Sequence, residues 1–228
     1  MIRVFLIRHG QSESNAGLPS RDPGSAPLTP TGHWQAERIA RALPDAPALI
    51  VTSPYLRAQQ SAQPTIRRFP ATPCQEWPVQ EFTYLGDLHE RSSTPREREP
   101  YARAYWDRAD PDHASTGAES FTSLLQRSAD CLRRLSAHQS GPIAVFTHGL
   151  FIRALAWSLL TGISTPDHDQ MRSFRHFANR YLIPNAGVVE LRCTSHGAPA
   201  LLGGSTIHLP DALAADRQPP RPAGRPNR

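Results

Sequence analysis

The chain lacks lysine altogether, so all 25 of its basic residues are arginine. We attribute this to coding bias, and the number of arginines by itself therefore carries no functional argument. The formal net charge is +5, of which the last twenty residues contribute +2, so the other 208 residues carry +3. Since no basic run with interleaved aromatic residues is present, the composition argues against a nucleic-acid partner.

Long apolar runs are also missing. No stretch approaches the roughly 18 apolar residues that a membrane span needs, although 39% of the residues are hydrophobic. The first residues lead directly into a strand-like run instead of the apolar core of a signal peptide, so we expect no membrane association, no export and a cytoplasmic location. A length of 228 residues favours one domain with an insertion.

Cysteine is scarce, and its spacing is not that of a metal site. The three cysteines, Cys74, Cys131 and Cys193, form neither a metal knuckle nor a redox pair. The ten histidines show no metal-ligand spacing either. We therefore expect no metal and no other cofactor.

What the chain does contain is an alternation of short apolar runs and amphipathic segments. Continuous apolar runs at residues 4–7, 48–52 and 142–147 predict buried strands. Apolar residues at helical spacing predict helices at 30–43, 56–63, 121–135 and 150–161. This alternation predicts an α/β fold with three layers (α/β/α) and a mostly parallel central sheet.

The alternation breaks down between residues 70 and 116, where prolines are frequent and only 101–108 suggests a helix. We interpret this segment as a small cap insertion over an edge of the sheet, which would select the substrate. Thr116 and Glu119 match a capping box for the helix that follows, and residues 188–191 and 206–209 are predicted late strands. Residues 1–209 are thus assigned to one domain and residues 210–228 to a disordered tail.

Polar residues follow three of the predicted strands directly. Arg8 and His9 follow the first, Arg57 comes soon after the second, and His148 follows the third. Carboxyl ends of parallel strands meet at one edge of a sheet, so these side chains can converge. A guanidinium fork and an imidazole beside Gly10, which permits close backbone approach, suit an anionic ligand. Each residue taken alone is equally consistent with a solvated surface position.

Further short motifs lie in a fixed order around these residues, and together they resemble one family, the histidine phosphatase superfamily, also called phosphoglycerate-mutase-like. The resemblance covers about residues 2–192, and its Arg-His-Gly and Ser-Pro-x-x-Arg-Ala-x-Gln motifs form a specific pair. The matching segments are Arg8-His9-Gly10 with Asn15, Leu28-Thr29 with Gly32 and Gln35-Ala36, Ser53-Pro54-Tyr55-Leu56-Arg57-Ala58-Gln59, Gly117-Ala118-Glu119-Ser120, His148-Gly149 and Asn185.

The resemblance implies that His9 is a nucleophile, which forms a phosphohistidine that water then hydrolyses. A neutral imidazole is a competent nucleophile near neutral pH. The resemblance also implies that Arg8, Asn15, Arg57 and His148 bind the transferred phosphate. Because phosphoryl transfer depends mostly on positioning and charge stabilisation, these groups can do the work of a divalent metal, and no metal is predicted.

The family pattern also places a carboxylic acid early in the cap, and Glu81 matches that position. Its apolar neighbours in the sequence would desolvate it and favour the acid form, which can protonate the leaving group. Glu76 and Glu90 are competing candidates, and a surface position for Glu81 remains open.

The chain departs from mutase members of the family after Glu81. Phe82-Thr83-Tyr84 stands where mutases carry Arg-His-Tyr, and Arg96 and Arg98 are separated by Glu97. We therefore expect a phosphomonoesterase of the histidine acid phosphatase type, acting on a small phosphorylated metabolite. Two alternatives stay open: a mutase moving phosphate between hydroxyls of a small acid, and a non-catalytic phospholigand-binding protein. The sequence names neither the substrate nor the oligomeric state.

Overall fold

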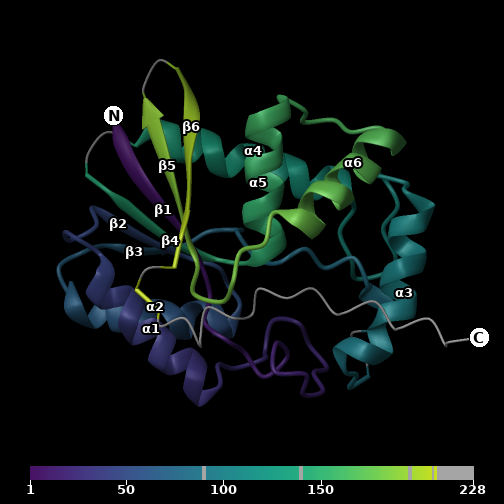
Figure 1. Ribbon diagram of the computed structural model, residues 1–228, viewed down its shortest axis with the longest axis horizontal. Helices are drawn as coiled ribbons and strands as arrows, with labels where there is room; N and C mark the ends of the chain where they lie inside the picture. Colours follow the sequence, from purple (N-terminus) through teal and green to yellow (C-terminus); the bar gives the residue numbers. More distant parts are fainter. Residues whose placement is uncertain (89–90, 139–140, 195–196, 207, 210–228) are drawn as a thin grey trace, which may run out of the picture.

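A six-stranded sheet with the order β3-β2-β4-β1-β5-β6 forms the centre of the molecule (Figure 1). The strands from β3 to β1 pair in parallel, whereas β5 runs antiparallel to both of its neighbours. The computed structural model describes residues 1–88, 91–138, 141–194, 197–206 and 208–209. Its elements are β1 (Ile2–Arg8), α1 (Pro30–Ala42), β2 (Leu49–Thr52), α2 (Leu56–Arg68), β3 (Cys74–Glu76), the 3-10 helix η1 (Gly86–Leu88), α3 (Pro95–Arg108), α4 (Phe121–Ala137), β4 (Ile143–Thr147), α5 (Gly149–Thr161), α6 (His168–Arg180), β5 (Val188–Thr194) and β6 (Gly197–Ser205).

Helices cover both faces of this sheet. Val4 and Leu6 of β1 belong to the apolar cluster that includes α4, α5 and α6, whereas Phe5 and Ile7 belong to the cluster of α1 and α2. Successive side chains of a strand point to opposite faces, so one continuous apolar run supplies both clusters. Figure 1 shows α1 and α2 on one side of the strands and α4 and α5 on the other. The predicted three-layer fold with a mostly parallel sheet is confirmed.

The register of the parallel strands brings three chain segments to one edge. Arg8 at the end of β1 lies opposite Thr147 at the end of β4, and Thr52 at the end of β2 lies opposite Phe146. The residues that follow β1, β2 and β4 therefore leave the sheet side by side, as expected for a parallel sheet.

The helix α2 is longer than expected: it was predicted to end before Pro64, and that prediction is wrong. The proline lacks only one N–H group, and the helix continues to Arg68. Its last turn is held by α1, since the guanidinium of Arg68 donates to the carbonyl oxygens of Ala40 and Leu43.

The start of α4 and the last strand also differ from expectation. Ser120 is the N-cap of α4 and accepts from the N–H of Ser123, so the predicted capping box at Thr116 is wrong. The strand expected at 206–209 is wrong too: β6 ends at Ser205, and Leu209 donates its N–H to Thr206 in a turn. The helix α6 was not expected at all.

The segment interpreted as a cap, residues 70–116, contributes the short strand β3 to the edge of the sheet and then leaves it. Beyond Glu76 it carries η1 and α3, and α3 lies well away from the strands in Figure 1. The helix α3 begins earlier than expected, with a capping box in which Thr94 and Glu97 each bond the other's backbone N–H. The tail at 210–228 lies outside the described residues.

None of the helices in the described part of the chain has the length and apolar character needed to cross a bilayer.

Two glycines allow the loop after β1 to lie against the first turn of α1. A Cβ atom at Gly32 would lie 2.1 Å from the carbonyl oxygen of Gln11, and one at Gly10 would lie 2.5 Å from the carbonyl oxygen of Gly32. In both cases the obstacle is backbone, which cannot turn aside as a side chain can. This close approach fixes the loop that carries the residues after His9.

We predict that Gly32→Ala lowers the free energy of unfolding by about 1–3 kcal/mol, the usual cost of overpacking. Urea unfolding measures the change. Gly204→Ala is the matched control, because a Cβ there meets only ordinary contacts at 3.6 Å. Equal stability of the two variants would contradict the close approach.

Candidate active site

The residues after the three strand ends form one cluster. His9 follows β1, Ser53 follows β2, and His148 follows β4. The ring centroids of His9 and His148 are 5.0 Å apart. Nε2 of His148 lies 2.8 Å from Oγ of Ser53, and Nε of Arg57, in the first turn of α2, lies 3.1 Å from Nε2 of His9. The predicted convergence is therefore present.

Hydrogen bonds define the tautomer of His9. The ring's Nδ1 lies 2.6 Å from the carbonyl oxygen of Gly10, which can only accept, so Nδ1 carries the proton. Nε2 in turn accepts from the Nε–H of Arg57. His9 is 2% exposed and lines a cavity. Its unprotonated Nε2 is thus held in place from both sides.

Burial and neighbouring cations keep both imidazoles neutral. Burial first, and then the charges of Arg57 and Arg8, hold the pKa of His9 well below its usual range. Burial, Arg57 and His9 do the same for the pKa of His148. His148 is completely buried, and its Nδ1 has no hydrogen-bond partner among the described residues.

The expected phosphate-binding residues lie around the same cavity, apart from His148. Arg8, Asn15 and Arg57 line it together with His9, and its volume is about 270 Å³. Arg57 is buried against the ring of Tyr55 and donates to the carbonyl oxygen of Pro23 at 2.5 Å. His148 lies behind the cavity wall, bonded to Ser53.

Arg8 and Asn15 are tied down by neutral groups. Arg8 donates to the carbonyl oxygen of Ile183 at 2.6 Å, and Asn15 accepts from the hydroxyl of Ser12 at 3.1 Å. A guanidinium held by a carbonyl keeps its full positive charge, so it remains able to attract an anion.

Glu81 also lines the cavity. Its Oε1 accepts from the N–H of Phe82 at 3.0 Å and from that of Leu150 at 3.1 Å, at the start of α5. The surroundings are therefore less apolar than expected, since two backbone N–H groups reach one oxygen. Of its two competitors, Glu76 is exposed and accepts from Gln59 outside the cavity, and Glu90 lies outside the described residues.

The sequence interpretation missed several residues of the site. Arg98 of α3 and the exposed Arg21 line the cavity, although Arg98 was considered only as half of a mutase-like pair. Arg98 donates to the serines at 14, 20 and 93, which joins the cap to the loop after β1. Glu119 was explained by a capping box, but it forms an ion pair with Arg127 at 2.5 Å. The described residues contain no group of three metal-ligating side chains.

Comparisons with known proteins point in one direction. The family model of the histidine phosphatase superfamily (branch 1) matches residues 4–202. A glucosyl-3-phosphoglycerate phosphatase of Mycolicibacterium vanbaalenii is 30% identical over 168 residues, 69% of this chain and 74% of the relative. A probable phosphoglycerate mutase of Serratia proteamaculans is 26% identical over 169 residues, 70% of this chain and 75% of the relative. The solved structure of a mycobacterial glucosyl-3-phosphoglycerate phosphatase with VO3 has a TM-score of 0.65 and 26% identity, and the match covers 84% of this chain and 93% of that one.

The burial of two neutral histidines predicts how the free energy of unfolding depends on pH. In the unfolded chain an imidazole takes up a proton below a pH of about 6.5, whereas His9 and His148 resist protonation in the folded protein. The unfolded state then binds more protons, so the free energy of unfolding falls as the pH drops below about 6.5, by about 1.4 kcal/mol per pH unit for each histidine. Urea unfolding at several pH values measures this slope.

His9→Asn and His148→Asn should each reduce that slope by about one histidine's share. His33→Asn is the control, because His33 is exposed, and it should leave the slope as in the wild type. Unchanged slopes in all three variants would contradict the depressed pKa values.

Proposed function

The chain belongs to the histidine phosphatase superfamily (branch 1), and we propose that it is a phosphomonoester hydrolase with a phosphohistidine intermediate on His9. The observation that carries this proposal is the state of His9: a buried, neutral imidazole with an unprotonated Nε2, in a cavity that the guanidinium groups of Arg8 and Arg57 also line. Nucleophilic attack requires the lone pair of Nε2, and a phosphoryl group requires the surrounding positive charge.

In the first half-reaction, Nε2 of His9 bonds to phosphorus as the bond between phosphorus and the leaving oxygen breaks. The ring becomes positively charged, and the Gly10 carbonyl that accepts its Nδ1–H stabilises that charge. Because Nε2 no longer accepts, the Nε–H of Arg57 turns to a phosphoryl oxygen. Arg8 and Asn15 donate to the other oxygens, and no metal is needed.

His148 has a supporting role in this proposal. Its Nε2 bonds Ser53, and it reaches the phosphoryl group when an oxygen of the substrate replaces that hydroxyl. The ring lies 5.0 Å from that of His9, so the required movement is small.

Glu81 donates and accepts the protons of the proposed reaction. In its acid form it protonates the leaving alkoxide, and in the second half-reaction the resulting carboxylate takes a proton from water as the water oxygen attacks phosphorus. The bond between phosphorus and Nε2 then breaks, and His9 returns to its neutral form. His9 and Glu81 both line the cavity of about 270 Å³, so a phosphate bound there can meet both residues.

The charges of the cavity favour a substrate with a second anionic group. Among the described residues, four arginines line it, at positions 8, 21, 57 and 98, together with the carboxylate of Glu81. A phosphate monoester offers about two negative charges, so some of these cationic groups are left over. We propose a small substrate whose leaving group carries a carboxylate, in keeping with the phosphoglycerate named in the relative's description.

A mutase is the second candidate, since one relative is described as a probable phosphoglycerate mutase. A mutase would return the phosphate from His9 to another hydroxyl instead of to water. Incubation with a phosphorylated hydroxy acid distinguishes the two, because a phosphatase releases inorganic phosphate and a mutase releases the isomer.

We further propose a metal-independent enzyme of the histidine acid phosphatase type in the cytoplasm. The three free cysteines suit a reducing compartment, and arginines occupy the place of a charge-stabilising metal. Activity that survives treatment with a chelator would support metal independence.

We predict that His9→Ala abolishes both turnover and transfer of labelled phosphate to the protein. In Glu81→Gln, kcat/KM for alkyl phosphates should fall by about 10²–10⁴-fold, the usual contribution of a general acid. Hydrolysis of p-nitrophenyl phosphate should change little, because its leaving group needs no proton. Stoichiometric labelling of His9→Ala would refute the nucleophile, and equal slowing of both substrates would refute the acid.

For the substrate class, Arg21→Gln should raise KM several-fold for phosphoserine or phosphoglycerate. It should leave KM for glycerol phosphate, which has no carboxylate, within about twofold of the wild type, the size expected for an exposed charge. Arg21 makes no hydrogen bond within the described residues, so its loss should not disturb the fold. The same rise in KM for both kinds of substrate would argue against carboxylate recognition.

A further inference from the structure

The segment that carries Glu81 has no regular structure to hold it. Residues 78–83 lie between β3 and η1 and belong to neither a helix nor a strand, so no ladder of backbone hydrogen bonds fixes them. Proton transfer requires the acid within hydrogen-bond reach of the leaving oxygen, and a misplacement of about 1 Å can cost about 10²-fold in rate. Something else must position this segment.

Four backbone carbonyl groups of the segment are bonded from outside it. Arg127 of α4 donates through Nη1 to the carbonyl oxygens of Pro78, at 2.9 Å, and Gln80, at 3.0 Å. The hydroxyl of Thr147 donates to Val79, and the N–H of Glu119 donates to Thr83. Arg127 thus holds the carbonyl directly before Glu81 and the one two residues earlier.

Arg127 is itself fixed by a carboxylate. Its Nε and Nη2 donate to the two oxygens of Glu119, at 3.2 and 2.5 Å, in a bidentate pair. The side chains are only 10% and 19% exposed. Burial raises the pKa of Glu119, and the guanidinium of Arg127 opposes that shift. All three guanidinium nitrogens of Arg127 are therefore engaged.

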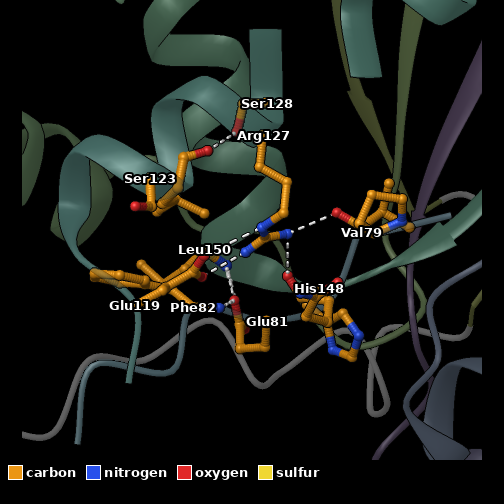
Figure 2. A network of polar contacts seen from close by, with 12 residues as sticks. Val79, Glu81, Phe82, Glu119, Ser123, Arg127, Ser128, His148 and Leu150 are labelled. Carbon is orange, nitrogen blue, oxygen red and sulfur yellow. Dashed lines mark hydrogen bonds and ion pairs between the residues drawn. The ribbon is translucent and has the colours of Figure 1, made fainter. Parts of the chain in front are cut away.

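The same arginine also contacts the helix that holds the carboxylate of Glu81. Its guanidinium carbon lies 5.0 Å from the ring centre of Phe151, the residue after Leu150, and the N–H of Leu150 donates to Glu81. Figure 2 shows Arg127 between Glu119, the segment of Glu81 and the start of α5. One side chain thus joins α4, α5 and the acid segment.

We propose that Arg127, oriented by Glu119, is the positioning residue for the acid Glu81. This inference rests on the proposed function. Arg127 is absent from the lining of the cavity, so it does not touch the substrate there and acts on proton transfer through the place of Glu81. Its charge also helps to lower the pKa of His148. The alternative is that Arg127 and Glu119 form a buried ion pair that stabilises the fold without positioning Glu81.

The test is Arg127→Met, which keeps an apolar stem against Phe151 and removes every donor. Its kcat/KM, which reports the step up to the phosphohistidine, should fall about 10- to 100-fold with an alkyl phosphate and by less than threefold with p-nitrophenyl phosphate. Arg133→Met on the same helix is the control, since that side chain is 76% exposed and, within the described residues, bonds Asp130 alone. It should match the wild type with both substrates.

A double-mutant cycle separates positioning from stability. In the Glu81→Gln background, Arg127→Met should slow the alkyl phosphate by no more than a further twofold, because the acid that it positions is already absent. Independent, multiplying effects would overturn the proposal, and so would equal slowing of both substrates by Arg127→Met alone.

Two further variants keep the test decisive if Arg127→Met does not fold. Glu119→Gln retains an oxygen acceptor for Arg127 and should give a smaller loss, again confined to the alkyl phosphate. Arg127→Lys retains the charge but lacks the planar guanidinium. Compared with Arg127→Met, it should regain more of the stability than of the alkyl phosphate turnover. Full recovery of both would overturn positioning by the guanidinium. Failure of the wild type to hydrolyse p-nitrophenyl phosphate would instead overturn the proposed function.

Discussion

The site depends on the parallel pairing of β4 between β1 and β2. This register places the residues after all three strands at one edge of the sheet, and His9, Arg57 and His148 meet there although they are far apart in the sequence. The side chains of the three strands pack into apolar clusters on both faces of the sheet, and a shift of one residue would exchange the side chains that the two clusters receive.

Neutral hydrogen-bond partners define the electrostatics of the cavity. Arg8 and Arg57 each donate to a backbone carbonyl oxygen, and a neutral acceptor leaves the positive charge of a guanidinium in place. The same charges, together with burial, keep His9 unprotonated. In the proposed reaction, a single arrangement thus keeps His9 ready for attack and attracts the phosphate. Holding these guanidinium groups away from water costs free energy. The packing of the rest of the domain offsets that cost, so the site depends on the stability of the whole domain.

An element could be predicted from the sequence where its own residues carry the apolar pattern of a strand or a helix. The runs that became β1, β2 and β4 are apolar on both faces, and α1, α4 and α5 carry clear apolar stripes, so the sequence indicated them directly. The helix α6 has a stripe of three buried residues and a capping box begun by Asp167, a signal that was present but overlooked. The glycine-rich β6 has little strand propensity, and its pairing with β5 decides its conformation.

By itself, the sequence indicated the fold class through local patterns, and its short motifs pointed to His9, Arg8 and Arg57 as candidate site residues. Only the tertiary structure decided that Arg98 and Arg21 line the cavity, that His148 does not, and that Glu119 pairs with Arg127. Those facts depend on contacts between segments far apart in the chain. Hydrogen bonds and burial at such contacts leave no periodic trace in the sequence.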